Sequence, residues 1–382
     1  MIGLALLLLA CAPAHTAIVP EPADTAPLTP RCPGFGEPCD ALAPLPEARP
    51  CGAALATSAP ADVAWPTRLS ELGCFVSFTP VAPGPGVVPF EVNSPLWTEG
   101  AHKQRFVALP PGGVISISRD AAWDLPPGGL WLKAFSAELA DTDGQLRPLE
   151  IRAMLRTAAG WAYASYGWDE ASQDLTLQPA LGGYQTWTIV HDGQPSEHAW
   201  YYPGDVGCRG CHRDLAEEVL GPHTAQLHRE VDYGHVRADQ LVALDTIGLL
   251  SPSPTTLGEL PRLPDPYAAD EPVAARARAW LHTNCAHCHR PGGFAPPDMQ
   301  LDLRFDTPDA AMAACGVPSG SGYYTDAAWI IAPGDPDDSA LYARLRLPGV
   351  EKMPPDGATW PDHAGIALIR AWITGMRPCP TR

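Results

Sequence analysis

The chain has 382 residues, 46% of them hydrophobic, and a formal net charge of −18 at pH 7. This composition is sufficient for buried cores in two or three domains. The excess of acidic residues excludes a protein that binds nucleic acid or an anionic membrane surface through a basic face. It favours a basic or neutral partner, with docking that weakens as salt screens the charges.

The N-terminus has the pattern of an export signal. Residues 1–10 form an apolar run that is too short to span a bilayer and fits the apolar part of a signal peptide. Leu8-Leu9-Ala10-Cys11 resembles a bacterial lipobox, in which Cys11 becomes the lipidated first residue. No Lys or Arg precedes the run, so an ordinary cleaved signal or a wrongly chosen start codon is the alternative. We expect an exported protein of the periplasm or cell envelope, with a lipid anchor at Cys11 as its membrane contact.

The residues after Cys11 divide into a tether and a β-rich domain. Residues 12–63 are rich in proline and alanine and poor in aromatic residues, which predicts an extended tether. In residues 64–205, short strand patterns alternate with Pro-Gly turns. Residues 149–155 and 161–168 flank a short polar turn and predict a β-hairpin. Turn signals about every ten residues favour a β-sandwich or an open barrel.

Two five-residue motifs carry most of the chemical information. They are Cys208-Arg209-Gly210-Cys211-His212 and Cys285-Ala286-His287-Cys288-His289. Each reads Cys-x-x-Cys-His, which is typical of covalent c-type haem attachment. Cysteines at this spacing lie about one helical turn apart and can reach the two vinyl groups of one porphyrin, while the adjacent histidine ligates the iron.

The sequence therefore predicts two haem c groups. Their thioether bonds would come from Cys208, Cys211, Cys285 and Cys288, and their proximal ligands would be His212 and His289. Zinc is the alternative metal. A four-cysteine zinc site usually has its pairs roughly fifteen to twenty residues apart, and it does not explain a histidine after each pair.

Helical patterns follow each motif. Residues 214–220 and 237–250 have apolar positions at intervals of three and four, a proline-dense loop covers 251–266, and a second helical block begins near Asp270. We therefore expect a multidomain α+β protein. Its β-sandwich or open-barrel domain (64–205) would precede a first helical haem-binding segment (206–268) and a mainly α-helical haem region (269–382).

Met353 is the expected sixth ligand of the second haem. A Met thioether is a common partner of a proximal histidine in electron carriers, and Met353 lies downstream of His289 in Lys352-Met353-Pro354-Pro355. Met299, Met312 and Met376 fit less well, and a packing role is the alternative for Met353. The order helix, motif, connector, Met-Pro-Pro loop and closing Trp-Ile helix resembles a class I cytochrome c domain over residues 269–382.

The sixth ligand of the first haem stays open. His223 and His228 become reachable if the chain folds back at Gly221-Pro222. The other candidates are His235, His102, His191, His198 and Met154. The alternative is a five-coordinate iron, which can bind small molecules or activate peroxide, whereas two strong ligands favour electron transfer alone.

Six cysteines remain besides Cys11 and the four in the motifs. An even number in an exported protein predicts disulfides, although six cysteines allow 15 connectivities. The pairing we expect is Cys32–Cys39, Cys51–Cys74 and Cys315–Cys379.

Four further blocks resemble a poorly characterised family of exported bacterial dihaem c-type cytochromes, over residues 64–378. The blocks are residues 92–97, 200–203, 281–285 and 301–306. The resemblance implies an exported electron-transfer protein, working between a redox partner and its two haems, rather than a stand-alone enzyme. The alternatives are a haem enzyme, peroxidase-like or activating small molecules, whose first haem is fed by the second, and a β-domain binding module with attached electron-transfer haems.

Overall fold

The computed structural model describes residues 51–191, 193–212, 220–234, 236–296, 299–320, 325–355 and 359–379. The signal segment with Cys11, residues 12–50 of the tether, the Cys32–Cys39 pair, His235 and most of the predicted helix at 214–220 lie outside these ranges. Within them, no helix combines the length and the apolar character that a membrane span requires.

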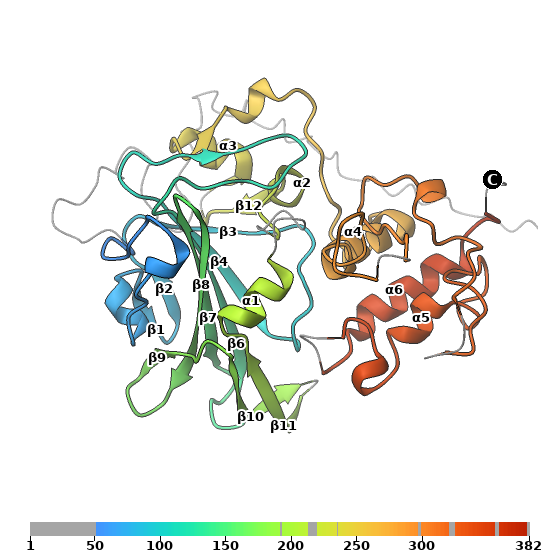
Figure 1. Cartoon of the computed structure of the whole chain (residues 1–382), viewed down its shortest axis with the longest axis horizontal. Coiled ribbons are helices and arrows are strands. Elements are labelled where there is room, and N and C mark those ends of the chain that lie inside the picture. Colours follow the sequence, from blue (N-terminus) through green and yellow to red (C-terminus); the bar gives the residue numbers. More distant parts are fainter. Residues whose placement is uncertain are drawn as a thin grey trace, which may run out of the picture.

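A six-stranded antiparallel sheet organises the molecule (Figure 1). In spatial order its strands are β3 (Val87–Phe90), β4 (His102–Ala108), β6 (Leu130–Glu138), β7 (Leu146–Thr157), β8 (Gly160–Asp169) and β9 (Asp174–Leu177). The predicted hairpin is confirmed as β7 and β8, which turn between Thr157 and Gly160.

Short strands surround this sheet. Two are hairpins, β1 (Phe75–Phe78) with β2 (Val81–Pro83) and β10 (Gly183–His191) with β11 (Gln194–Tyr202). The others are β5 (Ile115–Ser116), β12 (Glu230–Asp232), β13 (Arg237–Asp239) and β14 (Leu250–Ser251). β14 pairs in parallel with β5, so the segment after the first motif returns to the β region.

The expected fold class is wrong. The protein is mainly β, built on an antiparallel six-stranded sheet, and its described residues form no clear helical cytochrome c region. The helices are short and separated by long irregular connections. They are α1 (Asp205–Cys211), α2 (Thr224–Leu227), α3 (Gln240–Thr246), α4 (Val273–Cys285), α5 (Ala340–Arg344) and α6 (His363–Thr374), with single 3₁₀ turns at Pro60–Asp62, Leu69–Leu72, Pro254–Thr256, Asp309–Ala311 and Gly349–Glu351.

The helix expected over 237–250 shows why the helical reading failed. Its first three residues pair as β13 with β12, and Asp239 then caps α3 by accepting hydrogen bonds from the backbone of Leu241 and Val242. Gly248, at a φ of 75°, follows the helix, and the chain then enters β14. Apolar residues at helical spacing are therefore shared among a strand, a short helix and a second strand, all of which contribute to one core.

Three cores matter for the site. One face of the sheet buries Phe106, Leu132 and Ala153 with the N-terminal hairpin. The other face buries Val107, Trp131 and Tyr163 against side chains of α2, α3 and β14. A third core joins α4, α5 and α6, which gather on one side of the sheet (Figure 1).

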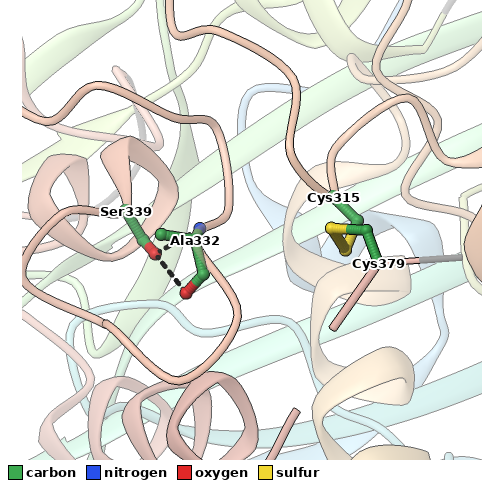
Figure 2. Close-up of a disulfide and its surroundings, with 4 residues drawn as sticks. All are labelled: Cys315, Ala332, Ser339 and Cys379. Carbon is green, nitrogen blue, oxygen red and sulfur yellow. Dashed lines mark hydrogen bonds between the residues drawn. A yellow bond between two sulfur atoms is a disulfide. The ribbon is translucent and has the colours of Figure 1, made fainter. Parts of the chain in front are cut away.

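Two of the expected disulfides are confirmed. Cys51 pairs with Cys74, and Cys315 pairs with Cys379. The second disulfide ties the connector after α4 to the C-terminal segment (Figure 2). Nearby, the Ser339 hydroxyl accepts a hydrogen bond from Ala332 N at 2.9 Å, which fixes the turn before α5 (Figure 2). Disulfides of this kind are typical of an oxidising compartment.

Candidate functional site

Both Cys-x-x-Cys-His motifs fold into a single helical turn. In the first, His212 N donates a hydrogen bond to Cys208 O at 2.9 Å at the end of α1; in the second, His289 N donates to Cys285 O, also at 2.9 Å, just after α4. A residue and its fourth neighbour lie on the same side of a helical turn. The backbone therefore gathers two sulfur atoms and one imidazole on each turn.

The structure sorts the cysteines into two classes. The motif cysteines belong to neither disulfide, whereas the other four in the described ranges are all paired. Burial raises the pKa of the Cys208 thiol to about 11 and that of Cys285 to about 12. These two thiols are thus protonated at neutral pH and stay out of thiolate chemistry unless a ligand or enzyme engages them.

The first motif lies against the large sheet. Cys208 packs on the core that contains Trp131 and Tyr163, and the His212 ring centroid is 5.5 Å from that of Tyr163. Arg209 lies over the same tyrosine ring at 5.3 Å. Strand β8 therefore positions the histidine of this motif.

The candidate sixth ligands of the first motif are held in different places. His228 has both ring nitrogens engaged, Nδ1 at 3.2 Å from Pro261 O and Nε2 at 3.5 Å from the Asp239 carboxylate. His223 Nε2 lies 3.4 Å from His282 Nε2, and burial followed by the charge of His282 lowers the pKa of His223 to about 3. The two histidines are therefore held by different partners.

The candidate sixth ligands from the β region also lie in different places. His102 is exposed at the start of β4, whereas the rings of His191 and His198 lie 4.6 Å and 4.3 Å from Trp360. Met154 is the one that packs on the same core as Cys208, next to its cross-strand partner Tyr163. The structure therefore brings Met154 close to the first motif.

His289 has the chemistry of a neutral metal ligand. Burial first, then the charges of His287 and Arg344, lower its pKa to about 4. Its Nδ1 is buried without a hydrogen-bond partner in the described part of the chain. A neutral imidazole with a lone pair on its second nitrogen is the form that binds iron. The residues of this motif therefore fit a covalently attached haem.

Met353 is connected to the surroundings of His289 through Arg344. Met353 N donates to Arg344 O at 2.8 Å, and the Arg344 charge acts on His289. The other methionines are placed differently: Met312 is 2% exposed in the third core, Met376 packs against that core, and Met299 is 37% exposed. Met353 is partly buried.

No shared zinc site forms from the two motifs. Within the described ranges, no three His, Cys, Asp or Glu side chains gather as a metal-ion site, so the two cysteine pairs are not brought together as zinc would require. No family model matches the chain, and no curated protein or solved structure is significantly similar to it.

Hydrogen bonds between two of the blocks, together with Gln226, which the sequence did not single out, connect the two motif-bearing parts. Trp97 N donates to Asn284 Oδ1 at 2.8 Å, beside Cys285, and Ser94 Oγ donates to Ala279 O at 3.0 Å. Gln226 Nε2 donates both to Ser94 O and to Thr283 Oγ1. Blocks 92–97 and 281–285 of the resemblance therefore pack directly on each other, which holds α4 and its motif at a fixed place beside the sheet.

Proposed function

We propose that the protein is an exported dihaem c-type cytochrome that passes single electrons between a redox partner and two covalently held haems. The observation that carries the proposal is that the motif cysteines form no disulfide, whereas the other described cysteines are all paired. Each motif is wound on one turn with a histidine beside it.

The side chains have distinct parts in this proposal. Cys208, Cys211, Cys285 and Cys288 would hold the porphyrins through thioethers, and His212 and His289 would bind the irons. The haem iron, when bound, supplies one-electron chemistry by alternating between its ferrous and ferric states. The chain fixes the orientation of each imidazole and lowers solvent access around it.

The contact between the two parts supports transfer from one site to the other. His223, eleven residues after His212, touches His282, which lies one turn before Cys285 on α4. Gln226 and Thr283 meet in the same region at 3.1 Å. The two motifs thus belong to segments in direct contact.

The stoichiometry and redox behaviour of the holoprotein test the proposal. Expressed with a c-type haem attachment system, the full chain should carry two haems that survive denaturation, as measured by intact mass, and should take up two electrons in a redox titration. A purified protein with intact motif thiols and no covalent haem would overturn it.

A haem enzyme is the second candidate. It is favoured because His223 and His228, the expected sixth ligands of the first haem, are engaged by His282, Pro261 and Asp239 instead. Electron paramagnetic resonance decides between the two functions. A high-spin signal that shifts with cyanide supports an enzyme, whereas two low-spin signals support a carrier.

Replacing Met353 by alanine should remove the Met–iron charge-transfer absorption at the red end of the spectrum and lower the midpoint potential of one haem, because a thioether stabilises the reduced iron. The exposed Met299 provides a control, since Met299→Ala should leave both properties unchanged. Absorption spectra of the oxidised proteins and spectroelectrochemical titration measure the effect. Loss of the band in the control instead of in Met353→Ala would show that Met353 is not the ligand.

A further inference from the structure

Three basic side chains lie in a row across the middle of the six-stranded sheet. Arg105 on β4 is the cross-strand partner of Lys133 on β6, which is in turn the partner of Arg152 on β7. Cross-strand partners project from the same face, and neighbouring strands are about 4.8 Å apart, so the row is roughly 10 Å long.

The row has more positive charge than its protein surroundings neutralise. In the described part of the chain, Arg105 and Lys133 make no ion pair, and the Lys133 ammonium lies 4.9 Å from the Phe135 ring. Arg152 is the exception, because Glu150 accepts hydrogen bonds from its Nε and Nη2 at 2.7 and 2.9 Å. Glu150 also accepts from Ser165 and Trp200 and is therefore fully used.

The lowered pKa values of Lys133 and Arg105 agree with this excess of positive charge. Burial, followed by the charges of Arg105, Lys103 and Arg152, holds the pKa of Lys133 well below its usual value. Burial and then Arg229 lower the pKa of Arg105 to about 10. Arg105, Lys133 and Arg152 are half-buried, and partly desolvated cations without partners cost free energy. An anion bound along the row would offset that cost.

Apolar side chains flank the row on the same face. Trp131, Met154 and Tyr163 form the next cross-strand row on one side, and Phe135 lies on the other. A pocket of about 450 Å³ adjoins the Arg105 end and is also lined by Lys103, Arg229 and the carboxylates of Glu91 and Asp232, of which Glu91 pairs with Arg229 at 3.0 Å. The surface therefore suits a ligand that is largely apolar and carries carboxylates at one edge.

The first motif lies beside this surface. Helix α1 packs on β8, the His212 ring contacts Tyr163, and the charge of Arg152 acts on both Cys208 and Cys211. From Arg152 the row runs through Lys133 to Arg105, away from the strand that carries Tyr163. In haem, the propionates are on the edge opposite the vinyl groups, so a porphyrin joined to these cysteines would direct its carboxylates away from them.

We propose that Arg105, Lys133 and Arg152 bind the propionate carboxylates of the first haem. This inference rests on the proposed function, because it requires a haem at Cys208 and Cys211. Arg105 offers the planar donor pair that matches a carboxylate, Arg152 offers the Nη1 donors that its pair with Glu150 does not use, and Lys133 offers a point charge between them. The same cations stabilise the reduced haem, whose net charge is more negative, and so raise its midpoint potential.

The test compares Lys133→Met and Arg105→Met with Arg156→Met in the holoprotein. Arg156 is a matched control on β7, because it is paired with the exposed Asp124 near the end of that strand. Intact mass counts the haems, and spectroelectrochemical titration gives the midpoint potential of each. We expect two haems in all three variants and, in the first two alone, a lower midpoint potential for one haem, with Lys133→Arg restoring it.

The possible results distinguish a failure of the propionate site from a failure of the proposed dihaem function. Two attached haems whose potentials match those of Arg156→Met would overturn the propionate site and leave the dihaem function standing. Absence of covalent haem in the unaltered protein would overturn both. A second measurement uses the haem-free chain, in which Lys133→Met should raise the thermal unfolding midpoint because it removes an unneutralised charge; a fall would show that the protein itself neutralises Lys133.

Discussion

Replacing Cys208 and Cys211 together by alanine should leave one covalently attached haem per chain instead of two. Thioether bonds are the only covalent links we propose between chain and porphyrin, and His212 alone would not hold the haem through denaturation. Intact mass under denaturing conditions measures the loss directly. The double replacement of Cys285 and Cys288 should remove the other haem, so that the two variants differ in the haem that remains.

The disulfide cysteines supply the control for this experiment. Alanine at Cys51 and Cys74 removes the same number of sulfur atoms from a buried position, yet it should leave both haems attached. Closing a loop of this length is worth roughly 3 kcal/mol in the chain-entropy account, so this variant should be less stable but fully loaded. Two haems on the Cys208/Cys211 variant would contradict the assignment of the first motif.

Replacing Asp362 by alanine should lower the free energy of unfolding of the α4–α6 part by roughly 2 to 4 kcal/mol, because the buried Trp280 indole, the partly exposed Tyr267 hydroxyl and a helix cap lose their acceptor together. Asp362 is 5% exposed. Its carboxylate accepts from Trp280 Nε1 at 2.8 Å, from the Tyr267 hydroxyl at 2.6 Å and from Gly365 N at 2.8 Å. It therefore connects α4, the loop before it and the start of α6.

Asp337 provides the matched control for this carboxylate. Its side chain is 70% exposed and lies 3.7 to 3.8 Å from Arg370 and Arg346, and exposed ion pairs contribute on the order of 0–1 kcal/mol. Chemical denaturation of both variants, followed by tryptophan fluorescence, gives the comparison. An unfolding free energy for Asp362→Ala equal to that of Asp337→Ala would show that the three hydrogen bonds do not stabilise the fold.

Local patterns in the sequence predicted local structure well. The β7–β8 hairpin forms where alternating residues flank a short turn, and Cys51–Cys74 and Cys315–Cys379 pair as expected. Hairpins depend on a few neighbouring residues, so their signal is contained in a short stretch. The two disulfides followed from removing the motif cysteines and pairing the remainder in chain order.

The predicted fold class was wrong because it depends on contacts between segments that are far apart in the sequence. Residues 237–250 have helical periodicity, but 237–239 pair with 230–232 and Leu250 pairs with Ile115, so strand partners elsewhere in the chain take both ends of the segment. Periodicity identifies the apolar face of a segment but does not identify its partner. The connector between α4 and α5 is rich in glycine and proline, and its described residues contain a single 3₁₀ turn and no α-helix.

The sequence by itself determined the chemistry of the two motifs, because five consecutive residues contain both the thiols and the imidazole that the proposed haem attachment needs. Only the tertiary structure decided what surrounds them. Arg105, Lys133 and Arg152 come from three separate strands and become neighbours through sheet register alone. The register brings their charges close enough to interact. The sequence alone does not show which residues of different strands become neighbours.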